Sequence, residues 1–176
     1  MQPTLYIFSG LPASGKSTLA KLLAQKLCAV YLRIDTIEQA LRDLCAFNVQ
    51  GEGYRLTYRV VTDNLNCGNS VISDSCNPIE LTRGEWEQVA IDTGANYVNI
   101  VIECSDGREH RHRVESRASE VHGLTLPDWD AVQNREYHAW TRPHIHIDTA
   151  KKSIEDSFNE LVEKLGLEDH LAVQRL

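Results

Sequence analysis

Residues 10–17 have the sequence GLPASGKS, which matches the pattern G-x-x-x-x-G-K-[ST] at every defined position. The pattern is informative when it follows a strand and opens a helix. Residues 5–8 (LYIF) form a short apolar run that is typical of a buried strand. After residue 16, leucines recur at positions 19, 22, 23 and 27, a spacing that places them on one face of a helix. The chain is therefore expected to fold around a phosphate-binding loop.

The residue types of this loop explain how it would hold phosphate. Glycines let the backbone wrap around phosphate groups, and the helix that follows adds the positive end of its dipole. Lys16 is expected to reach the β- and γ-phosphates, and the Ser17 hydroxyl to ligate Mg²⁺. The residues expected to bind ATP, or a close relative of it, are Gly10, Ala13, Ser14, Gly15, Lys16, Ser17 and Thr18. The alternative, a glycine-rich turn with a solvated lysine, leaves the flanking strand and helix unexplained.

Strands and helices are predicted to alternate along the rest of the chain. The predicted strands are residues 5–8, 30–34, 70–73, 97–102 and 145–147. The predicted helices start at residue 16 and cover 35–47, 54–66, 80–93, 106–121 and 153–165, with a further one that Asp128 caps and that carries Trp129, Tyr137 and Trp140. Alternation of this kind indicates an α/β fold with a mostly parallel sheet covered on both faces. We expect one domain over residues 1–176, with the charged stretch 106–127 as a candidate lid.

Two aspartates stand at the ends of predicted strands, where ligands of parallel sheets bind. Asp35 is placed to accept a proton from an acceptor hydroxyl, or to cap the next helix with Glu38 completing a capping box; one carboxylate can do both. Asp74 is a candidate to hold Mg²⁺ through water or to position the acceptor, although Ser75 follows it where a full Walker B pattern has an acid. Asn77, which precedes a proline, is either a substrate contact or a turn residue.

Arginines are concentrated in the predicted helix 106–121. Arg108, Arg111, Arg113 and Arg117 alternate there with glutamates. One interpretation is a solvated helix laced with ion pairs at three- and four-residue spacing. The other is a lid that brings guanidinium groups onto phosphates as charge spreads in the transition state. Because Arg113 and Arg117 are four residues apart on one helix face, they are the candidates for that catalytic role.

Charge and cysteine content limit the partners, the kinds of site and the cellular compartment that we expect for this protein. A net charge of −7 and a pI near 5.5 argue against a long nucleic-acid partner and against binding to anionic membranes. Five cysteines without a CxxC pair fit neither a disulfide framework nor a zinc site. With no basic leader and no apolar stretch of transmembrane length, we expect a cytoplasmic protein. For this size a monomer is the default expectation and a dimer the alternative.

These features together resemble the P-loop kinases of the predicted-kinase group, which have an AAA-type ATP-binding domain and include the kinase domain of polynucleotide kinase. Chloramphenicol phosphotransferase and the zeta toxins are more distantly similar. The resemblance covers nearly the whole chain. It rests on FSGLPASGKST, Asp35, ISDSCN with Asp74 and Asn77, ECSDGREHRHRVESR, and RPHIHIDTA near the end. Only the first of these segments is specific by itself, and the others gain weight from their order and spacing.

The resemblance implies a fold and a set of roles. The fold is an adenylate-kinase-like three-layer sandwich with five parallel strands in the order 2-3-1-4-5 and a small helical lid. Asp35 would be the general base, and the lid arginines would contact phosphate. The acceptor would lie between the helices of residues 36–66 and the segment 77–83. An anionic acceptor would meet Arg42, Arg55, Arg59 and Arg83. The chain departs from polynucleotide kinases after Asp35, because Thr-Ile-Glu-Gln follows where they have an arginine.

Three functions remain open from the sequence. The first is a phosphotransferase that uses Mg²⁺ and ATP and acts on a hydroxyl group of a small molecule, with Lys16, Asp35, Arg113 and Arg117 in catalysis. Asp35, Asp74, Asn77 and Arg83 would bind the acceptor, and Ser17 and Asp74 would hold the metal. The second is a kinase acting on a polynucleotide or a nucleotide-sugar. The third is a nucleotide-binding switch, in which Asp35 and the lid arginines would have no role.

Overall fold

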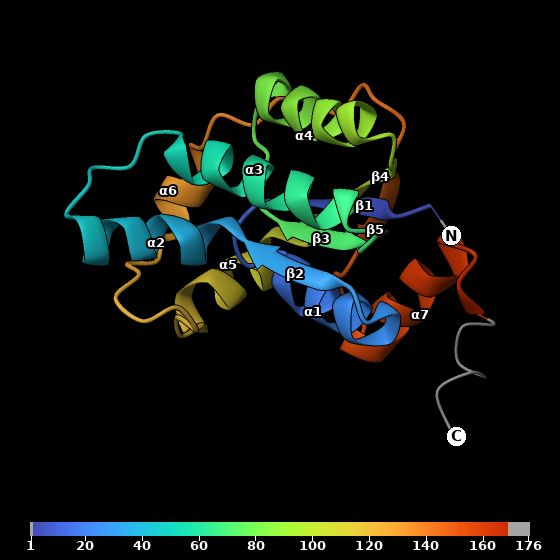
Figure 1. Ribbon diagram of the computed structural model, residues 1–176. Helices are drawn as coiled ribbons and strands as arrows, with labels where there is room; N and C mark the ends of the chain where they lie inside the picture. Colours follow the sequence, from blue (N-terminus) through green and yellow to red (C-terminus); the bar gives the residue numbers. More distant parts are fainter. Residues whose placement is uncertain (1, 169–176) are drawn as a thin grey trace.

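The computed structural model describes residues 2–168, which form one parallel β-sheet with helices on both sides (Figure 1). The strands lie in the order β2-β3-β1-β4-β5, and every pairing is parallel. Their bounds are β1 Thr4–Ser9, β2 Val30–Arg33, β3 Val71–Asp74, β4 Asn96–Glu103 and β5 Ile145–Asp148. The fold class and strand order expected for a P-loop kinase are thereby confirmed.

Two pairs of helices cover the two faces of the sheet. On one face lie α1 (Lys16–Leu27) and α7 (Ile154–Lys164), and on the other lie α3 (Glu52–Asn66) and α4 (Glu80–Thr93), as Figure 1 shows. The central strand β1 explains why both faces are needed, because its side chains alternate between them. Leu5 and Ile7 are fully buried against α3 and α4, whereas Tyr6 and Phe8 pack against α1 and α7.

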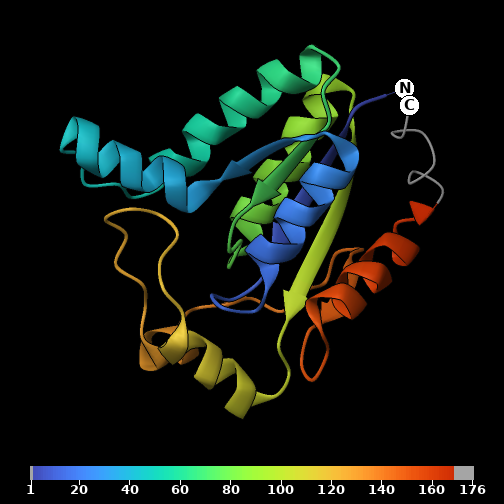
Figure 2. The same ribbon diagram turned by 90° about the horizontal axis from the view of Figure 1, so that it is seen from below.

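The remaining helices gather where the strands end. These are α2 (Ile34–Cys45), α5 (Gly107–Ser116) and the short α6 (Trp129–Gln133). Residues 117–128 run between α5 and α6, and in Figure 2 this loop extends from α5 towards α2. Gly123, at the far part of the loop, lies beside the side chains of Gln39 and Asp43 of α2. The loop therefore closes over the end of the sheet at which the phosphate-binding loop lies.

Three helix boundaries differ from the sequence prediction. The helix α5 ends at Ser116 and not at residue 121, so Arg117 has extended backbone and shares no helix face with Arg113. Only His110 and Val114 of α5 are buried, so no apolar stripe extends the helix further. The helix after Asp128 ends at Gln133, which leaves Tyr137 and Trp140 in irregular structure.

The third difference concerns the start of α2. The helix begins at Ile34, with Arg33 as its N-cap and without a side-chain cap. Asp35 therefore lies inside the first turn, and the predicted capping box with Glu38 is wrong. In the first turn an exposed aspartate still interacts favourably with the helix dipole. No helix in the described part of the chain is both long and apolar enough to cross a bilayer.

Candidate active site

The backbone of the phosphate-binding loop adopts conformations that restrict which residue types can occupy it. Gly10 has φ 147° and Gly15 has φ 97°, and Ala13 also has a positive φ of 65°. A Cβ atom on Gly10 would lie 2.2 Å from the carbonyl oxygen of Ile102, so no other residue fits there. The loop is thus packed directly against the neighbouring strand β4.

The first turn of α1 carries donors that the protein leaves unused. Its N-cap is Gly15, which provides no side-chain cap, and no acidic residue lies in the first turn. In addition, the Ser14 hydroxyl oxygen is buried and has no hydrogen-bond partner among the described residues. Uncapped N–H groups at a helix N-terminus form a ready site for an anion. This arrangement fits a phosphate group.

Lys16 and Asp74 form a buried ion pair beneath the loop, with 2.5 Å between Lys16 Nζ and Asp74 Oδ1. Tyr31 donates its hydroxyl to the other oxygen of Asp74 at 2.6 Å, and Ser17 also donates to this carboxylate. Burial raises the pKa of Asp74, but the Lys16 charge and these hydrogen bonds lower it by more, so the net pKa lies below its usual value. Asp74 is therefore ionised next to the Ser17 hydroxyl.

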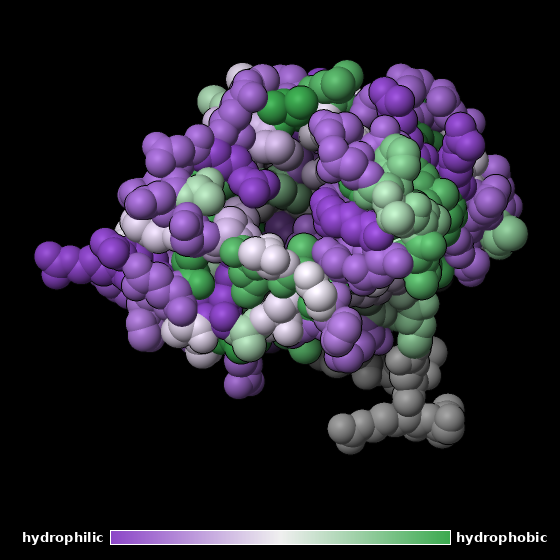
Figure 3. Space-filling model, turned by 90° about the vertical axis from the view of Figure 1, so that its left-hand side faces the viewer, coloured by the Kyte–Doolittle hydropathy of each residue, from purple (hydrophilic) through white to green (hydrophobic). Residues whose placement is uncertain are grey.

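A cavity of about 550 Å³ opens above the loop. Figure 3 shows the side of the molecule at which α2 and α6 lie; hydrophilic side chains cover most of it and the surface is hollowed near its middle. The residues lining the cavity come from four parts of the chain. Two parts are the loop with α1 (residues 10–13 and 15–19) and the residues at or just after the ends of β2 and β3 (Arg33, Asp35 and Cys76). The other two are the stretch from α5 to just after α6 (Arg113, residues 117–121, 124–127 and Arg135) and the stretch from the end of β5 into α7 (Thr149, residues 152–154 and Ser157).

Arg113 is held at the wall of this cavity by α5 and the β5–α7 turn. Its guanidinium donates to the Thr149 side chain at 2.8 Å, to the Thr149 carbonyl at 3.0 Å and to Glu109 at 2.6 Å. Thr149 in turn donates to the Ser14 carbonyl at 2.8 Å. Arg113 therefore links α5 to the phosphate-binding loop.

Arg117 differs from Arg113 in that its donors are not satisfied. Its Nε and Nη2 atoms are buried and have no hydrogen-bond partner within residues 2–168. Burial lowers the pKa of Arg117, the charge of Asp35 opposes this effect, and the charge of Arg135 adds to it. Burying a guanidinium nitrogen without a partner is costly. The position of Arg117 on the cavity wall leaves these nitrogens available to an anion inside the cavity.

A second cavity, of about 390 Å³, adjoins the first. Asp35, Cys76 and Arg135 line both cavities, so these three side chains mark the junction. The rest of the wall comes from α2, α3 and the start of α4: Ile34, Glu38, Gln50, Gly51, Tyr54, Arg55, Pro78, Ile79, Leu81, Thr82 and Glu85. This is the region between residues 36–66 and 77–83 in which the resemblance places an acceptor.

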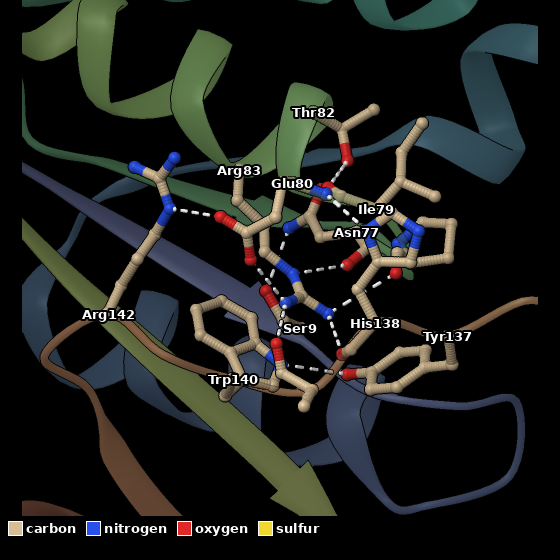
Figure 4. Close-up of polar contacts among 12 residues, drawn as sticks. Ser9, Asn77, Ile79, Glu80, Thr82, Arg83, Tyr137, His138, Trp140 and Arg142 are labelled. Carbon is tan, nitrogen blue, oxygen red and sulfur yellow. Dashed lines mark hydrogen bonds and ion pairs between the residues drawn. The ribbon is translucent and has the colours of Figure 1, made fainter.

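Asn77 and Arg83, expected to bind substrate, line neither of the two cavities. Arg83 is fully buried, and its guanidinium donates to the carbonyl oxygens of Asn77, Pro78, His138 and Ala139 and to Glu80 (Figure 4). Its guanidinium carbon lies 4.1 Å from the centre of the Trp140 ring. The Asn77 amide donates to Phe8 and Ser9 and accepts from Ser75 and Trp86. Arg83 therefore holds the segment 137–140 against α4, and Asn77 ties the chain after β3 to β1 and α4.

Two residues of the junction were missed by sequence reasoning. Cys76 lies in ISDSCN but was classed only as a thiol, and Arg135 lies in a stretch without a recognised motif. Arg135 reaches the junction because α6 ends at Gln133 and the chain turns there. A charged residue immediately after a short capped helix was the one available signal.

Glu120 of the 117–128 loop was expected only as part of a charged helix. It accepts hydrogen bonds from Lys21 of α1 and, at 2.9 Å, from Arg33 at the end of β2. His110 of α5 contacts the Pro12 carbonyl at 2.8 Å. The stretch from α5 to Glu120 is thus tied to the phosphate-binding loop at one end and to Lys21 and Arg33 at the other.

Comparison with known proteins adds family evidence. The family model described as an AAA domain matches residues 5–135. An L-seryl-tRNA(Sec) kinase of Methanococcus maripaludis is 26% identical over 173 residues, which cover 90% of this chain. The match covers 65% of that protein, so the chain spans less than two thirds of the length of this relative.

Solved structures share the fold. A putative kinase from Chloroflexus aurantiacus superposes with a TM-score of 0.74 at 20% identity, covering 97% of this chain and 99% of that one. The APS kinase CysC of Mycobacterium tuberculosis, in complex with AMPPNP and APS, has a TM-score of 0.65 at 19% identity, with 94% and 98% covered. A gluconokinase from Sinorhizobium meliloti has a TM-score of 0.67 at 14% identity, with 99% of each chain covered. At these identities the likeness shows the fold alone.

Proposed function

The chain belongs to the AAA domain family, and on that premise we propose that it is an ATP-dependent phosphotransferase acting on a hydroxyl group of a small acceptor. The observation that carries the proposal is the junction of the two cavities, where Asp35 faces both. A nucleotide switch needs only the first cavity. A second cavity that meets the first beside a carboxylate supports transfer between two bound molecules.

In the proposed reaction the first cavity binds ATP and the second binds the acceptor. The acceptor oxygen attacks the γ-phosphorus, the bond from that phosphorus to the β–γ bridging oxygen breaks, and ADP leaves. Asp35 accepts the proton of the attacking hydroxyl. Arg117 and Arg135 stabilise the charge that spreads over the transferred group. The unsatisfied Nε and Nη2 of Arg117 support this role. Arg113, whose donors are engaged, positions Thr149 and the loop.

The residues around Asp74 fit a magnesium ion. An ionised carboxylate and the Ser17 hydroxyl lie side by side, and both are oxygen ligands of the kind Mg²⁺ takes. Ser17 would hold the ion directly and Asp74 through water. When bound, Mg²⁺ neutralises charge on the β- and γ-phosphates. Lys16 would then leave Asp74 and bind the phosphates. We place the enzyme in the cytoplasm, where ATP and Mg²⁺ are present.

An acceptor carried on tRNA is a second candidate. The 26% identity to an L-seryl-tRNA(Sec) kinase, over 90% of this chain, favours it. The net charge of −7 opposes it, because proteins that bind long nucleic acids need cationic residues along the phosphate backbone. Small molecules therefore remain the first choice.

The test is transfer of labelled γ-phosphate from Mg·ATP to a panel of metabolites, antibiotics and seryl-tRNA, with Lys16→Ala as the control variant. Transfer to one small acceptor, lost in Lys16→Ala, is the expected result. Transfer to seryl-tRNA alone would favour the second candidate. Tight ATP binding with no transfer to any acceptor would overturn the proposal and leave the nucleotide switch.

A further inference from the structure

The acceptor cavity presents more negative than positive charge to a molecule inside it. Asp35, Glu38 and Glu85 line it, against Arg55 and Arg135. Arg135 lies at the junction, where the transferred phosphate is proposed to pass. Arg55 is exposed, and its charge already acts on the neighbouring Glu52, whose pKa it helps to lower. Three carboxylates therefore face two guanidinium groups, one of which lies at the junction with the first cavity.

Glu38 is held inside this cavity by the local backbone. A Cβ atom on Gly53 would lie 2.2 Å from Glu38 Cγ and 2.9 Å from its Oε1, so a glycine at the start of α3 makes room for this carboxylate. Burial raises the pKa of Glu38 above its usual value, and Arg42, 3.3 Å away and more exposed, offsets only part of this effect. A partly desolvated carboxylate gains most from a cation that enters the cavity.

Glu85 and Tyr54 add to the same wall. Glu85 accepts the Tyr58 hydroxyl at 3.0 Å, which fixes the orientation of its carboxylate. Tyr54 packs edge-on against Tyr58, with 6.2 Å between ring centres, and lines the cavity. Two carboxylates beside an aromatic ring are groups that recognise ammonium ions.

Of the four arginines expected to meet an anionic acceptor, Arg55 lines this cavity, and the other three are engaged or lie elsewhere. Arg83 is fully buried and its donors are taken up by carbonyl oxygens and Glu80. Arg42 pairs with Glu38, and Arg59 is exposed and absent from the walls of both cavities. The expectation of an anionic acceptor, based on these residues, does not agree with this arrangement.

We propose that the acceptor is a small organic cation, a molecule that carries both the hydroxyl group to be phosphorylated and a protonated amine bound by Glu38 and Glu85. Amino alcohols and amino sugars belong to this class. The inference rests on the proposed phosphotransferase function, since it assigns the acceptor of that same site. Beyond that function, the inference assigns a positive charge to the acceptor and names Glu38 and Glu85 as the side chains that select it.

The test uses compounds that share one skeleton and differ in charge. One set is glucosamine, glucose and glucuronate, and a second is aminopropanediol, glycerol and glycerate. Binding to the whole protein is measured by calorimetry in the presence of Mg²⁺ and a non-hydrolysable ATP analogue, and phosphate transfer is measured with ATP. In at least one set the amine is expected to bind at least ~10-fold more tightly than its neutral counterpart, a difference of about 1.4 kcal/mol.

Two variants show whether the named carboxylates are responsible. Glu38→Gln and Glu85→Gln keep the side-chain shape and are each expected to weaken amine binding about tenfold, while ATP affinity stays unchanged. Glu163→Gln is the matched control, because Glu163 is exposed on α7, across the sheet from the cavity. Its amine affinity should equal that of the parent protein.

The outcomes separate this inference from the proposed function. Phosphate transfer to neutral or anionic compounds with equal or higher kcat/KM would overturn the cation site and leave the phosphotransferase intact. Amine binding that depends on Glu38, with no transfer to any compound, would support the cation site and count against the phosphotransferase. If no amine binds more tightly than its neutral counterpart, the inference is wrong.

Discussion

Arg83, which is fully buried, and Arg117, which is half-buried, lie in different regions and differ in how their donors are used. Arg83 donates to four carbonyl oxygens and Glu80 and stacks near Trp140, so its region, residues 77–83 and 137–142, is complete without a ligand. Arg117 has a buried Nε and Nη2 without partners, and it lies beside a cavity. Both have buried guanidinium nitrogens, so burial of these atoms does not separate a structural arginine from a functional one. The presence or absence of partners does.

The largest expected effect is that of Arg117→Ala on catalysis. If its guanidinium stabilises the transferred phosphate, kcat should fall about 10²- to 10³-fold, as when one donor to developing charge is removed. The melting temperature should not fall, because the change also removes two buried guanidinium nitrogens that have no hydrogen bonds. Steady-state kinetics and thermal unfolding of the same preparation measure both. A stable variant with the kcat of the parent protein would show that the unpaired donors of Arg117 have no catalytic role.

The next effect is that of Arg83→Met on stability. The substitution keeps much of the side-chain volume but removes the donor to the carbonyl oxygens of Asn77, Pro78, His138 and Ala139 and the ion pair with Glu80. We expect the free energy of unfolding to fall by about 3 kcal/mol. Denaturant unfolding measures this loss, with Arg108→Met on the exposed part of α5 as the control. A variant as stable as the parent would show that the arginine does not hold this region together.

A smaller effect is expected from Glu120→Gln. This substitution removes the charge that holds the loop 117–128, between α5 and α6, to Lys21 and Arg33. The Glu120 side chain is 61% exposed, so its pairs with Lys21 and Arg33 contribute at most about 1 kcal/mol. The KM for ATP should rise a few-fold and kcat should change little. The change should shrink as salt concentration increases, because exposed pairs are screened. An effect that is independent of salt would rule out this role.

The smallest effect is a pH dependence of stability due to Glu38. Its folded-state pKa lies above the usual value of 4.5, so the folded protein binds this proton more tightly than the unfolded chain. The contribution of Glu38 to the free energy of unfolding therefore falls as the pH rises through that raised pKa. Glu38→Gln should remove this slope and be more stable than the parent at neutral pH. Parallel stability curves for the two proteins would contradict the assignment.

The features predicted correctly from the sequence alone are those that depend on residues close together in the chain. The phosphate-binding loop and its strand and helix follow from residues adjacent in sequence, and the sheet order follows from the family resemblance. The acceptor cavity was harder to predict from the sequence, because it depends on contacts between residues that are far apart in the chain. The roles of Arg83 and Arg117 depend on partners more than fifty residues away or on the lack of them, which spacing does not encode. Arg135 reaches the junction only through the early end of α6.

The central claim is that phosphate passes between the two cavities with Asp35 as the base, and Asp35→Asn tests it most directly. Single-turnover transfer from labelled Mg·ATP to the acceptor found in the panel should slow by about 10²- to 10⁴-fold, the range for loss of a general base. ATP affinity should stay within a factor of about two, because the substitution leaves the phosphate-binding loop itself unchanged. Transfer at the parental rate would contradict the claim and show that another group accepts the proton.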